Sequence, residues 1–124
     1  MKLSKIAAVV AATAVTCGGA LAAAAPADAA PAKPATANLT TVIDQWTHWS
    51  PDTSPSTHAG ELYAGTSYFY CWTYGEWYSN NGHYDNVWLQ TDDDWPTYNK
   101  RVYVSDVNLD DWGWHNDQNV LTQC

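Results

Sequence analysis

The stretch SYFYCWTY, residues 67–74, decides the fold that this sequence predicts. In an extended chain successive side chains point to opposite faces, so Ser67, Phe69, Cys71 and Thr73 would share one face. The opposite face then carries only aromatic rings. Aromatic residues favour strands, and a glycine bounds the run on each side. We therefore predict a central β-strand with one core face and one aromatic face.

Three more segments, residues 61–63, 86–91 and 101–105, are predicted to be strands with the same alternation. The predicted interior consists of Phe69, Cys71, Val87, Leu89, Val102 and Val104. The predicted aromatic surface consists of Tyr68, Tyr70, Trp72, Tyr74, Trp88 and Tyr103. Residues 75–82 and 91–99 are expected to be loops, the second because of its proline and clustered acids. The pattern predicts a small all-β barrel.

The first 29 residues have the order of a secretory signal peptide. Lys2 and Lys5 precede an apolar run, and Ala27-Asp28-Ala29 supplies an A-x-A cleavage site. A membrane span and a lipid anchor at Cys17 are the alternatives, although the apolar run is shorter than the roughly 20 residues that a bilayer needs. We expect a secreted protein that has no membrane attachment after cleavage.

Two cysteines, Cys71 and Cys124, remain after cleavage. In an exported protein this count predicts one disulfide, the alternative being two free thiols. Closing a loop of roughly 50 residues would contribute about 4 kcal/mol in the chain-entropy model. The bond would fasten the end of the chain to the central strand.

The chain is acidic, with a formal net charge of −8. Acidic surfaces repel the phosphates of nucleic acids and the headgroups of anionic lipids. We therefore expect neither nucleic acid nor an anionic membrane as a partner.

Residues 30–60 differ in composition from residues 61–124, and they are predicted to form a flexible N-terminal arm before a β domain. Within the arm, residues 38–49 contain an amphipathic segment with helical spacing, formed by Leu39, Val42, Ile43, Trp46 and Trp49. A helix this short is marginal in water. It would need a surface to lie on, either in its own domain or on another protein.

Nothing in the sequence points to catalysis or to a cofactor. The four histidines, His48, His58, His83 and His115, are scattered without metal-ligand spacing. The run Asp92-Asp93-Asp94 could bind calcium, but a solvated acidic turn that suppresses edge pairing is the favoured interpretation. We expect a protein that is not an enzyme and has no metal site.

Residues 62–109 resemble the bacterial SH3-like domains of exported proteins. The resemblance rests on AGTS at 64–67, VWLQT at 87–91 and RVYVSDVNL at 101–109. It implies an SH3-like barrel of about five strands with a C-terminal extension. That extension, with its cysteine pair, looks like a variant found in small exported proteins of high-GC Gram-positive bacteria.

The arrangement of an N-terminal arm followed by a domain with one disulfide is similar to that of small adaptor subunits in the umbrella toxin particles of streptomycetes. This similarity implies a secreted, non-enzymatic adaptor that joins other secreted proteins, such as a lectin-like propeller and a toxin scaffold. Residues 38–49 would dock onto a partner and order on binding. The alternative is a cell-wall module that binds peptidoglycan or glycan through the aromatic surface, since rigid rings bury area at little entropic cost.

Overall fold

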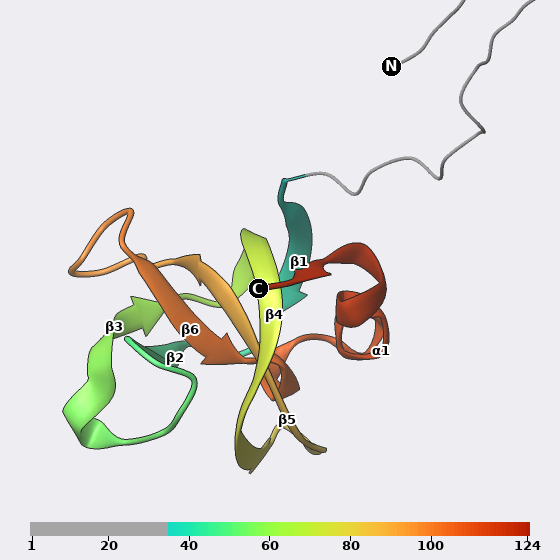
Figure 1. The fold of residues 1–124 in the computed structure, drawn as a ribbon, viewed down its shortest axis with the longest axis horizontal. Coiled ribbons are helices and arrows are strands. Elements are labelled where there is room, and N and C mark those ends of the chain that lie inside the picture. The colour runs from blue at the N-terminus through green and yellow to red at the C-terminus, as the bar shows by residue number, and fades with distance from the viewer. Residues whose placement is uncertain (1–34) are drawn as a thin grey trace, which may run out of the picture. The chain divides into compact units, whose positions relative to one another are not determined.

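The structure is a computed structural model that describes residues 35–124, which belong to one compact unit. The predicted signal peptide, 1–29, lies outside the described residues, as does the first part of the predicted arm. Within residues 35–124 the chain is mostly β, with one α-helix and two short 3₁₀ helices (Figure 1). No helix in this part is long and apolar enough to span a membrane.

The strands form one sheet with the order β1-β4-β5-β6-β2-β3, and β7 pairs with β4. The strands are β1 (Ala37–Thr41), β2 (Gln45–His48), β3 (His58–Leu62), β4 (Gly65–Asn80), β5 (His83–Asp92), β6 (Arg101–Ser105) and β7 (Thr122–Gln123). All pairs are antiparallel except β4 with β7. The path ends at β1 and β3, so the sheet is not closed as the predicted barrel would be.

β4 contains the stretch that was predicted to be the central strand, and it is twice as long as predicted. It pairs with β5 in a long hairpin whose far end projects from the rest of the fold (Figure 1). The turn is Asn81-Gly82, with φ angles of 55° and 76°. Asparagine and glycine tolerate such positive φ values better than other residues. The predicted loop at 75–82 is therefore wrong, except for this turn.

Segment 38–49, whose spacing also fits a helix, contributes to β1 and β2 and is therefore extended within the sheet. Leu39 lies opposite Ser67 of β4, and Gln45 lies opposite Leu62 of β3. Pairing with these strands outweighs the helical spacing, which the β-branched residues of the segment support only weakly. The boundary predicted after residue 60 falls inside β3, and the residues before it are part of the same sheet.

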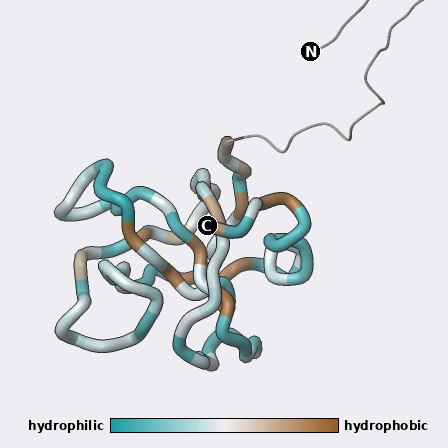
Figure 2. Tube along the Cα trace, in the orientation of Figure 1, coloured by the Kyte–Doolittle hydropathy of each residue, from teal (hydrophilic) through white to brown (hydrophobic). Residues whose placement is uncertain are grey.

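The core is built on the predicted interior face. It also includes residues near both ends of the described chain, Leu39 and Leu121. Its buried cluster contains Leu39, Leu62, Phe69, Val87, Leu89, Val104, Leu109 and Leu121. Val102 is buried as predicted, whereas Cys71 is only half-buried. Figure 2 shows that hydrophobic residues occur as short stretches separated by hydrophilic segments. The alternation in β4, β5 and β6 was thus a sound guide to the interior.

Neighbouring segments cover the two ends of the sheet path. On β3, the Glu61 amide donates to the Trp95 carbonyl at 2.7 Å, and the Glu61 carbonyl accepts from Asp94 at 3.0 Å. Beyond β1, Thr41 forms an isolated bridge with Leu109. The main-chain groups at these positions are therefore already paired within the molecule.

The predicted disulfide between Cys71 and Cys124 is confirmed. β7 places Thr122 beside Cys71 in parallel register, and the Cys124 amide donates to the Trp72 carbonyl at 2.8 Å. The C-terminal segment is therefore fixed to β4 by main-chain hydrogen bonds as well as by the covalent bond.

The helix α1 (Asp111–Val120), which we did not predict, lies between the 3₁₀ helix η2 (Asp106–Asn108) and β7. The Asp110 side chain caps its N-terminus by accepting from the Gly113 amide at 2.8 Å. Asp117 of α1 and Asp106 of η2 are both buried, and one oxygen of each has no donor in the described residues.

A shared proton explains the two buried carboxyls. Burial, followed by hydrogen bonding to Asp117, raises the pKa of Asp106 far above its ordinary value. Burial also raises the pKa of Asp117. Neighbouring buried carboxyls cannot all ionise, so Asp106 keeps its proton and shares it with the carboxyls of Asp117 and Asp85. The shared proton links α1 to η2, which follows β6.

Candidate binding pocket

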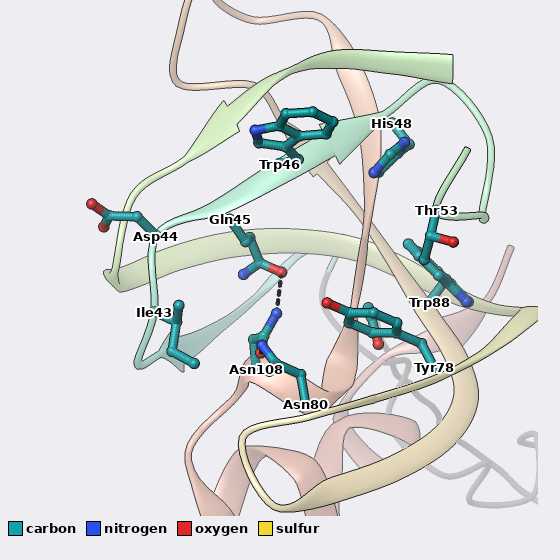
Figure 3. A pocket seen from close by; sticks show the side chains of 11 residues that line it. Ile43, Asp44, Gln45, Trp46, His48, Thr53, Tyr78, Asn80, Trp88 and Asn108 are labelled. Atoms are coloured by element: carbon teal, nitrogen blue, oxygen red, sulfur yellow. Dashed lines mark hydrogen bonds between the residues drawn. The ribbon is translucent and has the colours of Figure 1, made fainter. Parts of the chain in front are cut away.

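A pocket of about 290 Å³ opens between β2 and the point where β6 passes into η2 (Figure 3). β2 and β6 are in register at one pair only, His48 with Tyr103. Continued antiparallel register would pair Thr47 with Val104 and then Trp46 with Ser105. Neither pair is formed, and Trp46 and Ser105 line the pocket instead. The pocket therefore lies where two neighbouring strands of the sheet separate.

Three side-chain amides form a hydrogen-bonded chain along the pocket. Asn80, at the end of β4, donates to Asn108 of η2 at 2.9 Å. Asn108 donates in turn to the Gln45 Oε1 atom at 3.0 Å. The Gln45 Nε2 atom is buried and has no partner among the described residues. An unpaired buried donor costs roughly 1–3 kcal/mol, so this amide marks a place where a ligand oxygen would be favourable.

Aromatic rings form the walls. The Trp46 ring stacks on His58 with centroids 3.8 Å apart, and 53% of its residue surface stays exposed. On another side Tyr78 lies 6.3 Å from Trp88, centroid to centroid. The Trp88 indole donates to the Glu76 carbonyl at 2.8 Å, which fixes its orientation. The pocket can therefore contact the apolar parts of a ligand as well as its polar atoms.

The lining is close to uncharged. His48 is buried, and this burial lowers its pKa, so its ring is neutral in neutral solution. Of the lining residues in the described part, only Asp44 carries a full charge. Its carboxylate accepts from the Ala64 amide at 2.8 Å and points away from Gln45 and Tyr78 in Figure 3. Donors, acceptors and ring faces without charge suit the noncovalent binding of a neutral group.

Residues 50–57, which belong to the predicted flexible arm 30–60, form a hydrogen-bonded strap beside the pocket. The Asp52 carboxylate accepts from the Ser50 hydroxyl at 2.7 Å and from the Thr57 hydroxyl. These hydrogen bonds, the Thr57 bond foremost, lower the pKa of Asp52. Thr53 donates to Glu76 of β4 and places its side chain at the pocket rim.

The structure separates the five predicted partner-binding residues into two groups. Leu39 is buried in the core, with 3% of its surface exposed. Val42, Trp46 and Trp49 are 47%, 53% and 49% exposed, and Ile43 lines the pocket. We call Val42, Trp46 and Trp49 the apolar rim. Most of the predicted set therefore remains accessible although its backbone lies in the fold.

The predicted aromatic surface is less continuous than expected. Tyr68 and Tyr74 are exposed, whereas Tyr70, Trp72 and Tyr103 are half-buried. Trp88 is 2% exposed, so its assignment to this surface is wrong. The strap and β2 cover the face of β5 on which it lies.

Part of the same surface is held by internal contacts. The Tyr68 and Tyr70 hydroxyls both donate to Asp92, and Arg101 lies over the Tyr70 ring at 3.9 Å. The hydrogen bond to Asp92 raises the pKa of Tyr68 to about 12. These rings therefore serve first to hold β4 and β5 together.

The acidic run that could have bound calcium serves as a set of hydrogen-bond acceptors. Asp93 is buried and accepts from the hydroxyls of Thr47 and Thr97. Asp94 accepts from the Tyr63 amide at 2.9 Å. No group of three ligating side chains in residues 35–124 is arranged to hold a metal ion. The loop is thus tied to β2 and β3 by its carboxylates.

Sequence reasoning missed the amide chain. Gln45, Asn80 and Asn108 are far apart in the sequence, and no local motif marks any of them. Only the sheet order and the turn at Asn81 bring them together. Comparison of this chain with known proteins finds no relative. No family model, no curated protein and no solved structure matches it.

Proposed function

We propose that the protein is a non-enzymatic adaptor that binds a partner protein through the apolar rim. The observation that carries the proposal is the exposure of Val42, Trp46 and Trp49. Trp46 lies in β2, and the amides of Val42 and Trp49 donate to the carbonyls of Asn108 and Thr57. Exposed tryptophans on a rigid support are typical of binding hot spots, because little entropy is lost when they are covered. A pocket adjoins them, which gives a partner both apolar and polar contacts.

More specifically, we propose that the adaptor is exported and related to bacterial SH3-like domains. It would work in an extracellular complex, such as a toxin particle that contains a propeller and a toxin scaffold. The disulfide is compatible with an oxidising compartment. The remaining support is the similarity of layout and motifs described from the sequence.

Capture from culture supernatant tests the adaptor function. The tagged full chain is compared with the double variant Trp46→Ala/Trp49→Ala, and captured proteins are identified and quantified by mass spectrometry. Deletion of residues 38–49 would be a poor test, since it removes parts of β1 and β2. Trp112→Ala is the matched control, because Trp112 is equally exposed but lies on α1.

We expect one or a few proteins to be recovered at least tenfold less with the double variant and unchanged with the control. Equal recovery of every protein by all three chains would contradict an adaptor function at this surface.

A cell-wall module remains a second candidate because Tyr68 and Tyr74 are exposed on the aromatic surface. Sedimentation with purified cell wall separates the two functions, since an adaptor should stay in solution. Tyr74→Ala is a better test variant than Trp72→Ala. Trp72 packs against the core, so its replacement would also destabilise the fold. Cosedimentation that Tyr74→Ala abolishes would favour the wall module.

A further inference from the structure

We propose that the pocket beside β2 receives one uncharged residue of an extended segment of the partner protein. The inference deepens the proposed adaptor function and depends on it for the source of that segment. Three features of the pocket carry it: an interrupted strand pairing, an unpaired amide donor and a neutral lining.

The interrupted pairing indicates main-chain recognition. Trp46 lies opposite Glu61 of β3, but the main-chain groups of Glu61 bond to residues 94 and 95 instead. Residues that pair without exchanging hydrogen bonds turn their main-chain groups away from each other. Those of Trp46 therefore point to the pocket side, where pairing with Ser105 is not formed. A short extended segment can supply the missing main-chain partner.

The amide chain indicates what the inserted residue must offer. The Gln45 Nε2 donor requires an oxygen acceptor, and a carboxamide or a hydroxyl on the partner would supply one. The Asn108 bond occupies the Gln45 Oε1 atom, so the polar atom of this side chain that has no partner among the described residues is the Nε2 donor. The position of Gln45 thus selects a ligand that accepts a hydrogen bond.

The charge balance excludes ionised side chains. A lysine or arginine would find no carboxylate directed into the pocket, since Asp44 points away. A carboxylate would meet only neutral donors and an acidic protein of net charge −8. Burying a charge without a counter-charge is costly. An uncharged residue such as glutamine, asparagine, serine or threonine remains.

The size of the pocket limits the ligand to about one residue. Small-molecule sites generally span roughly 300–1,000 Å³, and this pocket lies at the lower end of that range. The apolar rim adjoins the pocket through Trp46, so a segment that leaves the pocket would cross the exposed indole.

Titration of the full chain with capped tripeptides, followed by the NMR signals of its amides, tests the inference. The probes are acetyl-Gly-Gln-Gly-amide, the same peptides with Glu or Lys in the middle, and N-acetylglucosamine. We expect the glutamine peptide to shift the Gln45 side-chain amide and the Trp46 main-chain amide, with a millimolar Kd. The charged peptides should bind at least tenfold more weakly.

Gln45→Glu is the matched variant, because it keeps an acceptor for Asn108 and replaces the amide donor with a negatively charged oxygen. It should weaken the glutamine peptide at least tenfold, while Trp112→Ala leaves its affinity unchanged. The peptide series needs no protein variant, so the test holds even if Gln45→Glu folds poorly.

Three results would overturn the inference: no shift at Gln45 with any peptide, equal affinity for charged and uncharged peptides, or larger shifts with N-acetylglucosamine. The last would make the pocket a sugar site. The adaptor function fails separately, if the double variant of the apolar rim captures the same proteins as the unchanged chain. A partner lost with that variant but retained by Gln45→Glu would overturn the pocket inference alone.

Discussion

Replacing Asp106 with asparagine should stabilise the protein at neutral pH, by an amount that grows with pH. In the folded chain Asp106 keeps a proton, which it donates to Asp117, whereas in the unfolded chain it ionises with a pKa near 3.8. The folded state therefore binds more protons above this pH. The stabilising effect of the proton is fully present below pH 3.8 and declines as the pH rises toward the raised folded-state pKa.

The magnitude follows from the cost of holding the proton. Keeping one carboxyl protonated above its unfolded-state pKa costs about 1.4 kcal/mol per pH unit, or about 4 kcal/mol at pH 7. An asparagine amide donates to Asp117 without this cost. Asp106→Asn should therefore match the unchanged chain near pH 4 and exceed its unfolding free energy by up to about 4 kcal/mol at pH 7.

Urea unfolding followed by tryptophan fluorescence, with the disulfide intact, measures the difference from pH 4 to 8. Asp52 and Glu76, whose pKa values are lowered by hydrogen bonds, act in the opposite direction as the pH falls. Both are present in every chain, so their effect cancels. Glu61→Gln, a change from carboxyl to amide on β3, is the control for the loss of a carboxyl elsewhere in the sheet.

Asp106→Ala separates the proton from the hydrogen bond. It removes the donor and leaves the Asp117 carboxylate buried, so we expect it to be roughly 1–3 kcal/mol less stable than Asp106→Asn at pH 7. A constant difference between Asp106→Asn and the unchanged chain across this pH range would refute a shared proton. So would an asparagine variant that is less stable at every pH.

Two further predictions concern the ends of the described chain. Reduction of the bond between Cys71 and Cys124, 53 residues apart, should lower the unfolding free energy by about 4 kcal/mol, measured as a shift in the urea midpoint with and without dithiothreitol. An unchanged midpoint would show that β7 holds without the bond. Leu39→Ala should cost about 3 kcal/mol and Val42→Ala less than about 1, because only Leu39 is buried. Equal small losses in thermal melts would contradict the place of β1 in the core.

The sequence predicted well wherever alternation was local and one face was apolar. The strand at 101–105 matches β6 at both ends, and the central strand lies within β4. The disulfide followed from the two cysteines that remain after the predicted signal cleavage, together with the predicted export. These features depend on neighbouring residues or on composition, which a single sequence contains.

The failures have a common cause, which is long-range pairing. The spacing of apolar residues in segment 38–49 fits a helix, but β4 and β3 offer hydrogen-bonding edges that no local pattern reveals. Trp88 was placed on the surface because β5 alternates, yet the strap covers that face. α1 follows the capping residue Asp110, but its glycine and asparagine residues have low helix propensity, so the sequence did not indicate a helix there.

The candidate site was only half predictable. Trp46 and Trp49 stood out as large apolar residues in a polar context, and the structure leaves them exposed. Gln45 gave no signal, because its importance arises from Asn108 and from the separation of two strands.

The covered margins of the sheet bear on how the molecule behaves in crowded solution. The main-chain groups of Glu61 pair with Asp94 and Trp95, and Thr41 is bridged to Leu109, so a second copy could not extend the sheet at these two positions. We expect concentrated samples to remain monodisperse despite eight tryptophans and eight tyrosines, and to resist templated fibril growth.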